Sequence, residues 1–131
     1  MGARSLRIDK ATERAVHDLF QSKAESRIYL YLLRRNGARS TDIIRGTRLH
    51  PSTVRELLVR MHTQRLIYRE KLKNDHIGKN PYIYRAAAPL TLLKRYAHDL
   101  ETKLNKIANL AKHTTSTTAV RIDIEIEEVD T

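Results

Sequence analysis

Residues 51 to 63, with the sequence PSTVRELLVRMHT, carry the side chains of this chain that are best suited to chemistry. Proline favours the first turn of a helix, and four apolar residues then follow at the spacing of one helical face. These inward residues are Val54, Leu57, Leu58 and Met61. The opposite face then carries Ser52, Arg55, Glu56, Val59 and Thr63, with Thr53 and Arg60 at its flanks. Hydroxyl, guanidinium and carboxylate groups on the free face of one helix suit hydrogen bonds to bases and phosphates.

Three side chains near the middle of this face are candidates for contacts with base edges. Arg55 is the best candidate, because a guanidinium binds guanine O6 and N7 with two hydrogen bonds. Glu56 either accepts a hydrogen bond from cytosine N4 or orients Arg55 without reading a base. Val59 either touches a thymine methyl group or is simply exposed. The sequence leaves both pairs of alternatives open.

A second group of residues suits phosphate contacts, which position a protein on nucleic acid without specifying a sequence. Ser52 and Thr53 combine hydroxyl groups with the N–H groups of a helix N-terminus. Arg39, Arg45, Arg48 and His50 are expected to flank the nucleic-acid backbone. The expected DNA-binding set also includes Ser40, Thr41, Glu56 and Arg60.

Positive charge is concentrated around this helix. The chain of 131 residues has 25 Lys and Arg against 15 Asp and Glu, which gives a formal net charge of +10. Residues 34 to 85 hold 13 basic and 4 acidic side chains, whereas residues 120 to 131 hold 1 and 5. The basic region favours a polyanionic partner, with nucleic acid ahead of an acidic membrane surface.

Other features of the sequence exclude several classes. The absence of Cys excludes disulfides, thiolate catalysis and cysteine-based zinc sites. The N-terminus lacks the apolar run of a secretory signal, and no segment approaches the ~18 apolar residues of a membrane span. We therefore expect a cytoplasmic protein that is not inserted into a membrane.

Capping signals and periodicity predict five helices. A helix over residues 9 to 21 comes first. Ser22 and Glu25 then match a capping box, and Asn36-Gly37 supplies a left-handed stop, so a helix lies between them. Ser40-Thr41-Asp42 caps a short helix over 42 to 48, and a tight turn leads to the helix at Pro51. A long amphipathic helix runs over 89 to 113.

Strand-like alternation occurs in two places. Residues 65 to 73 alternate, a polar tip follows, and residues 82 to 86 resume strand-type residues, which predicts a two-stranded hairpin. Val120, Ile122, Ile124 and Ile126 alternate with charged residues, which predicts a half-buried strand near the C-terminus.

The long helix carries an apolar seam whose residues are separated by alternating steps of four and three. Its members are Leu93, Ala97, Leu100, Leu104, Ile107 and Ala111. Because the seam extends well beyond the expected body of the domain, we expect it to pair with a second copy in a homodimer.

The stretch STDIIRGTRLHPSTVRELLVRMHTQRLIYREKLKNDHIGKNPYIYRAAAP, residues 40 to 89, resembles the winged helix-turn-helix of archaeal and bacterial regulators of the TrmB, MarR and ArsR type. The resemblance covers residues 24 to 89. It implies that helix 51 to 63 reads a major groove and that the hairpin tip, 73 to 81, lies along a minor groove. The corresponding wing residues are Lys73, Asn74, His76, Lys79 and Asn80.

The sequence departs from that family in two places. Arg65 stands where the turn after the recognition helix usually has Gly, so either Arg65 has an unfavourable backbone angle or the turn differs. The usual Gly-Arg-Pro of the wing appears as Gly78-Lys79-Asn80-Pro81.

The expected fold class is α+β, mostly α with a small β hairpin: a winged helix-turn-helix with a long C-terminal dimerisation helix and a terminal strand. The expected divisions are an N-terminal arm and helix (1–21), a winged-helix DNA-binding domain (22–88), a dimerisation helix (89–113) and an acidic strand or tail (114–131).

Three other classes have less support. No phosphate loop or hydrolase motif is present, so we do not expect an enzyme. His98 with Glu101 or His113 does not have the spacing of one metal site, so no metal and no cofactor is expected. The tyrosines suit buried packing better than stacking on RNA bases.

We therefore expect a sequence-specific regulator that binds double-stranded DNA as a homodimer, with a pseudo-palindromic site. The alternative is a winged-helix protein-interaction module whose acidic C-terminal strand pairs with a partner's sheet edge. A third reading has the acidic tail fold back onto the basic surface and compete with DNA. The operator sequence, the direction of regulation and any small-molecule effector do not follow from the sequence.

Overall fold

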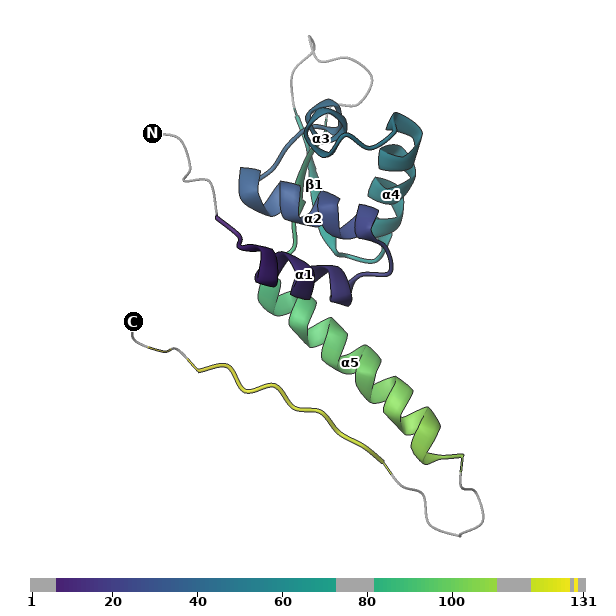
Figure 1. Ribbon diagram of the computed structural model, residues 1–131. Coiled ribbons are helices and arrows are strands. Elements are labelled where there is room, and N and C mark those ends of the chain that lie inside the picture. Colours follow the sequence, from purple (N-terminus) through teal and green to yellow (C-terminus); the bar gives the residue numbers. More distant parts are fainter. Residues whose placement is uncertain (1–6, 73–81, 111–118, 128, 130–131) are drawn as a thin grey trace. The chain divides into compact units, whose positions relative to one another are not determined.

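The computed structural model of the protein describes residues 7–72, 82–110, 119–127 and 129 (Figure 1). The chain divides into an N-terminal unit, Met1–Ala87, and a C-terminal unit, Ala88–Thr131. The N-terminal unit contains four helices and a two-stranded sheet among its described residues, and the C-terminal unit contains one helix.

The first two helices each begin after a residue whose side chain caps the helix N-terminus. Helix α1, Lys10–Leu19, begins after Asp9, whose carboxylate accepts from the Thr12 N–H at 2.7 Å, and this bond lowers the pKa of Asp9. Helix α2, Lys23–Arg35, begins after Ser22, whose hydroxyl accepts from the Glu25 N–H. Asn36 ends α2 in the left-handed conformation, with φ 54°. The predicted bounds of α2 are therefore confirmed.

The next two helices follow each other through a tight turn. Helix α3, Ser40–Thr47, begins two residues earlier than predicted, and the Asp42 carboxylate accepts from the Arg39 N–H. Arg48 ends it with φ 59°. Helix α4, Pro51–Thr63, begins at the predicted proline. Helices α2 and α3 pack closely where Tyr31 of α2 meets Gly46 of α3. A Cβ atom added to Gly46 would overlap the Tyr31 ring.

Two backbone hydrogen bonds close the C-terminus of helix α4, just before the chain enters the sheet. The Leu66 N–H donates to the Met61 carbonyl at 2.9 Å, and the Arg65 N–H donates to the His62 carbonyl at 3.0 Å. Arg65 has φ 60°, a conformation in which glycine would be free of strain. The unfavourable angle considered at this position is therefore present.

The predicted hairpin is confirmed in its described strands. Strand β1, Ile67–Lys71, pairs antiparallel with β2, Tyr82–Ala86, and Ile67 lies opposite Ala86. Ala38 adds an isolated bridge on the other edge of β2, by exchanging two hydrogen bonds with Tyr84. The sequence analysis did not identify this bridge, and it joins the α2–α3 connection to the sheet.

Helix α2 is the centre of the N-terminal core. It contacts α1, α3, α4 and β2, and its buried side chains include Ile28, Tyr29 and Leu32. The Tyr29 hydroxyl donates to the Ala87 carbonyl at 2.7 Å, and burial raises the pKa of Tyr29 to about 12. The inward residues predicted for α4, namely Val54, Leu57, Leu58 and Met61, are all buried.

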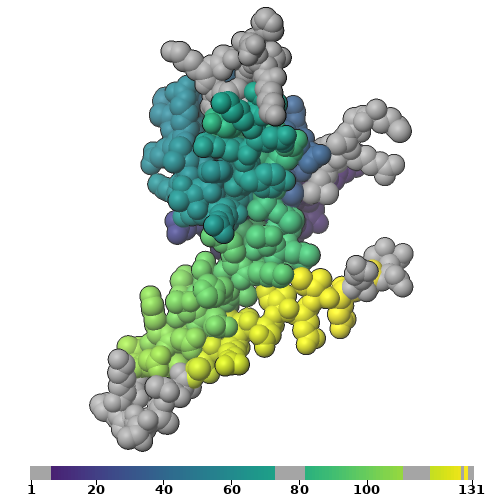
Figure 2. All heavy atoms as spheres, turned by 180° about the vertical axis from the view of Figure 1, so that it is seen from behind, coloured from purple at the N-terminus to yellow at the C-terminus, as the bar shows by residue number. Residues whose placement is uncertain are grey.

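The C-terminal unit contains helix α5, Pro89–Ala108, and an extended segment over residues 119–127. Both views show the segment, in yellow, lying along α5, in green (Figures 1 and 2). The helix ends five residues before the predicted bound of 113. The predicted terminal strand is wrong for the described residues, because the hydrogen-bond partners of this backbone are helix side chains rather than a second strand.

The predicted fold class is confirmed as mostly helical with a small antiparallel hairpin, and α3, α4, β1 and β2 follow one another in the predicted order. Among the described residues, no helix is long and apolar enough to cross a membrane.

Candidate nucleic-acid interface

The outward face of α4 is exposed to solvent, as the helical period predicts. Its exposed residues are Ser52, Arg55, Glu56, Val59, Arg60 and Thr63. Val59 is 65% exposed, whereas the apolar residues on the other face of the helix are buried. The face therefore combines hydrogen-bonding groups with one apolar side chain.

Arg60 is held by two carboxylates. One guanidinium nitrogen lies 3.5 Å from Oε1 of Glu25, and another lies 3.3 Å from Oε1 of Glu56. The Glu25 side chain is only 2% exposed, and its Oε1 has no hydrogen-bond partner in the described part of the chain. An unpaired carboxylate at that depth would be costly, so Arg60 compensates a buried charge at the start of α2.

The same arrangement shows that Glu56 does not orient Arg55, and the contact with cytosine stays a prediction. Its carboxylate pairs with Arg60, one helical turn further on, rather than with Arg55. Arg55 is exposed and has no hydrogen bond or ion pair in the described part of the chain. The guanidinium of Arg55 is therefore available for an external partner, whereas that of Arg60 is engaged.

The N-terminus of α4 is capped by a histidine. Nδ1 of His50 accepts from the Ser52 N–H at 3.2 Å and lies 2.7 Å from the Ser52 hydroxyl. The sequence analysis assigned His50 to the nucleic-acid backbone, and the structure gives it this capping contact as well. A phosphate that approached Ser52 would meet a side chain already bonded to this imidazole, while Thr53 is half-buried beside it.

The residues expected to contact phosphate from α3 occupy different environments. Thr41, Arg45 and Arg48 are exposed. Arg39 is half-buried, and its Nε has no hydrogen-bond partner in the described part of the chain. Ser40 is 8% exposed and is the first residue of α3 rather than its cap, so the expectation of a surface hydroxyl there is corrected.

The tip of the wing, with Lys73, Asn74, His76, Lys79 and Asn80, lies outside the described residues. Two arginines on its strands are engaged in contacts within the sheet. The Arg69 guanidinium lies 4.4 Å from the centre of the Tyr82 ring, and Arg85 bonds to Glu70 at 2.8 Å. Both contacts join β1 to β2 across the hairpin.

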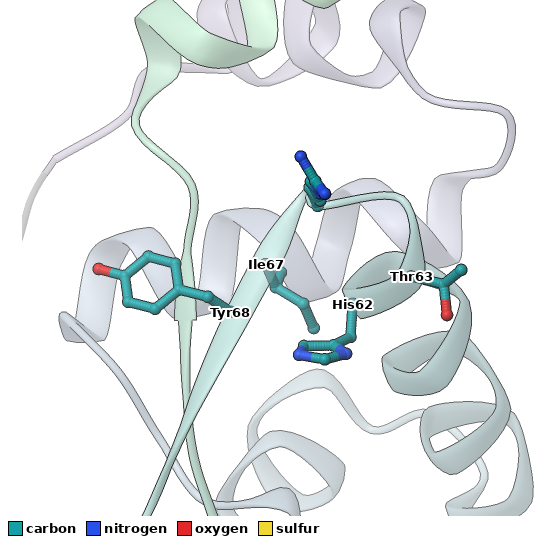
Figure 3. Close-up of a pocket in the computed structure, with 5 residues that line it drawn as sticks. His62, Thr63, Ile67 and Tyr68 are labelled. Carbon is teal, nitrogen blue, oxygen red and sulfur yellow. The ribbon is translucent and has the colours of Figure 1, made fainter.

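An open hollow lies between the end of α4 and the start of β1 (Figure 3). It has a volume of about 590 Å³ and is lined by His62, Thr63, Arg65, Ile67 and Tyr68. Figure 3 shows the Tyr68 ring directed away from the His62 side of the hollow. The hollow is open to solvent, so it is not an enclosed ligand cavity. His62 and Arg65 make part of its rim basic.

The seam predicted on α5 is exposed in part. Leu93, Leu100 and Ile107 are exposed, and Ile107 is 63% exposed. Leu104 is half-buried, and Ala111 lies outside the described residues. Ala97 is buried and lines a hollow with Ile122 and Ile124, so its expected place on a free seam is corrected.

No group of three or more potential metal ligands comes together in the part of the chain that the structure describes.

Comparison with known proteins gives a match among solved structures. No protein-family model matches the sequence, and no curated protein matches it. Among solved structures, the chain is similar to a possible transcriptional regulator from Methanosarcina mazei Go1, with a TM-score of 0.63 and 17% sequence identity. The match covers 86% of this chain and 99% of that chain. At this identity the likeness shows the fold alone, and it does not distinguish TrmB, MarR and ArsR types.

Proposed function

We propose that this protein is a sequence-specific regulator of transcription that binds double-stranded DNA as a homodimer. The observation that carries the proposal is the free guanidinium of Arg55 on the exposed face of α4. The opposite face of the same helix is buried in the core. A major groove is wide enough to admit one α-helix, and α4 offers an uncovered side with groups suited to base edges.

In this proposal three residues of the exposed face have distinct roles. Arg55 binds a guanine through O6 and N7, and Val59 contacts a thymine methyl group. Arg60 does not read bases, because its guanidinium already pairs with Glu25 and Glu56. It instead holds α4 to the start of α2, so that Arg55 is presented from a fixed helix.

Phosphate contacts surround the recognition helix. Thr41, Arg45 and Arg48 are exposed on α3 and the turn after it, and His50, Ser52 and Thr53 lie at the start of α4. By the resemblance to winged helix-turn-helix regulators, the wing over residues 73 to 81 approaches the adjacent minor groove. The 13 basic side chains against 4 acidic ones in residues 34 to 85 support a polyanionic partner.

The homodimer is supported by the exposed leucine and isoleucine side chains on α5. Leu93, Leu100 and Ile107 recur every seven residues, which is the period of a paired helix. Two copies would present two α4 helices to half-sites about one helical turn apart, ~34 Å, or a multiple of it. The structural neighbour, a possible transcriptional regulator, supports the same class of function.

The decisive experiment is selection of bound sequences from a random DNA pool, followed by binding measurements on the selected site. Arg55→Ala should cost about 1–3 kcal/mol on that site and relax the preference at one base pair. Arg45→Ala is the matched control, because it removes an exposed arginine assigned to phosphate. It should weaken binding to all DNA about equally and lower the salt slope by about 1.

Salt dependence gives a second measurement of the same proposal. If six or more phosphates are neutralised, affinity should fall roughly 10³-fold or more between 50 and 200 mM salt. No enrichment of any sequence, together with a flat salt dependence, would reject DNA binding. The protein-interaction module would then be the better reading, because the segment 119–127 is extended and outside the sheet.

A further inference from the structure

Three charged side chains meet where α4 lies against the start of α2. The Nη1 atom of Arg60 lies 3.5 Å from Oε1 of Glu25, and its Nη2 atom lies 3.3 Å from Oε1 of Glu56. One positive and two negative charges leave this group with a formal charge of −1. The guanidinium of Arg60 is therefore more than neutralised within its own chain.

The two carboxylates of this group lie in different environments. The Glu56 side chain is 72% exposed, whereas the Glu25 side chain is 2% exposed. In the described part of the chain, Oε1 of Glu25 has no hydrogen-bond partner, and Glu25 forms an ion pair with Arg60 alone. Water can replace Arg60 at the exposed Glu56. Removing Arg60 from the buried Glu25 leaves an uncompensated charge, which is costly.

The carboxylate of Glu25 is fixed in the core of the N-terminal unit. Glu25 is the third residue of α2, and its N–H donates to the Ser22 hydroxyl at 3.1 Å. The dipole of a helix stabilises a negative side chain in the first turn. The nearby Ser26 and Ile28 are completely buried. Arg60 is thus held by a charge that cannot follow it towards the surface.

Arg60 would otherwise suit a contact with DNA phosphate. Its side chain is 46% exposed and lies about 140° around α4 from Arg55, at the other flank of the exposed face. Arginine binds phosphate through two parallel hydrogen bonds, and phosphates border both sides of a groove that admits a helix. A phosphate would compete easily with the exposed Glu56 for this guanidinium. It would compete poorly with Glu25, because the buried charge would lose its partner.

We propose that Glu25 is a positioning residue for DNA binding, which acts through Arg60 by keeping its guanidinium away from DNA phosphates. The proposal rests on the proposed function, in which α4 lies in a major groove, and adds to it a residue of α2 that contacts no DNA. Of the two arginines in α4, only Arg55 then contributes attraction to DNA. Glu25 thereby limits the affinity that does not depend on sequence.

The salt dependence of binding to a random-sequence duplex tests this role, because its slope reports the number of phosphate contacts. Glu25→Gln removes the buried charge with little change in shape, so Arg60 becomes free to bind a phosphate. The slope of log affinity against log salt should become steeper by about 1, and affinity at low salt should rise severalfold. A purely structural role predicts equal or weaker binding with no steeper slope, and that result in a folded variant would overturn the proposal.

Glu56→Gln is the matched control. It also removes one negative charge from a partner of Arg60, and from a more exposed position. If the count of charges alone governed binding, Glu56→Gln would change the slope at least as much as Glu25→Gln. We expect it to change the slope less than half as much, because Glu25 still holds Arg60. Equal changes in the two variants would reject the role of Glu25.

A second substitution tests whether the effect passes through Arg60. In Glu25→Gln/Arg60→Met the slope should return to that of the natural protein, and no buried charge is left uncompensated. A slope that stays steep would contradict the proposal. Should circular dichroism show that Glu25→Gln does not fold, Arg60→Met alone decides: an unchanged slope supports the proposal, and a slope lower by about 1 overturns it.

The proposed function and the role of Glu25 fail in different ways, because the random-sequence duplex requires no operator. If the slopes differ as expected but no sequence is selected from a random pool, Glu25 has this role and the sequence-specific function is wrong. If a sequence is selected but Glu25→Gln and the natural protein have equal slopes, the proposed function stands and the role of Glu25 is wrong.

Discussion

The hairpin and the C-terminal segment have the same two-residue alternation, but only the hairpin forms strands in the described part of the chain. Strands β1 and β2 exchange backbone hydrogen bonds with each other, and β2 gains a second partner at Ala38. Residues 119–127 instead bond to the side chains of Asn105 and Glu101. The difference shows that alternation predicts an extended backbone, whereas a strand also requires a second extended backbone beside it.

The hairpin is also the more deeply buried of the two regions. Ile67 and Tyr84 anchor the hairpin in the core of the N-terminal unit, whereas Ile124 and Ile126 of the segment are exposed. The hairpin is therefore part of a cooperative core, and the segment is held locally. Each of the following measurements tests that contrast.

The largest effect is expected from removing an anchor of the hairpin. Tyr84→Ala deletes a buried aromatic side chain and should lower the free energy of unfolding by about 3–5 kcal/mol. Urea unfolding followed by circular dichroism measures this change. Tyr68→Ala, at a site 52% exposed on β1, should change it by less than about 0.5 kcal/mol. Similar small changes for both variants would mean that the hairpin is no better anchored than the segment.

The next effect is a pH dependence at the end of the hairpin, where Tyr29 donates to Ala87. Burial raises the pKa of Tyr29 to about 12 from 10.0, so its hydroxyl resists ionisation in the folded protein. This contribution to stability is complete below pH 10 and is lost as the pH rises from 10 to 12. Unfolding free energies measured across that range should fall more steeply for the natural protein than for Tyr29→Phe. Parallel profiles would contradict the assignment.

A smaller effect is expected at the turn that enters β1. Arg65→Gly relieves a left-handed backbone angle and should stabilise the protein by about 1 kcal/mol in thermal or urea unfolding. The neighbouring Gln64→Gly is the control, since Gln64 has φ −79° and no strain to relieve. A gain from Gln64→Gly and none from Arg65→Gly would show that strain at Arg65 does not limit the hairpin.

The smallest effect on overall stability is expected from releasing the segment. Asn105→Ala removes both hydrogen bonds to Val120 and should speed exchange of the Val120 amide about tenfold or more. Unfolding of the N-terminal unit should not change. Asn109→Ala, one turn further along the chain, should leave the Val120 amide as it is. A loss of N-terminal stability in Asn105→Ala would contradict the local character of the attachment.

Much of the N-terminal fold could be predicted from local signals. Ser22, Asn36 and Pro51 set helix bounds by capping and backbone geometry, which act within a few residues. The buried face of α4 followed from helical periodicity alone. The bridge between Ala38 and Tyr84 carried no such signal, because it joins residues far apart in sequence through backbone groups that every residue has.

The candidate site was predictable in its outline but not in its internal pairing. Periodicity placed Arg55 and Arg60 on the exposed side of α4, and both were assigned to DNA. Only the tertiary structure brings Glu25, from the start of another helix, to Arg60. In the sequence Glu25 matches a capping box, and its buried carboxylate has no local signature. The same limit applies to Ser40, which the sequence suggested as a cap and which lies inside the first turn of α3.

Helix α4 has one set of residues that holds the fold and another that is exposed, and this separation has a practical consequence for changing the proposed DNA preference. Arg60 and the four inward residues maintain the fold, and Ser52 bonds to the capping His50, while Arg55 and Val59 project outward and have no structural role in the described contacts. These side chains can be replaced together while the buried face of α4 still packs against the core. Under the proposed function, a library confined to Arg55 and Val59 should therefore give folded variants that differ in the DNA sequences they prefer.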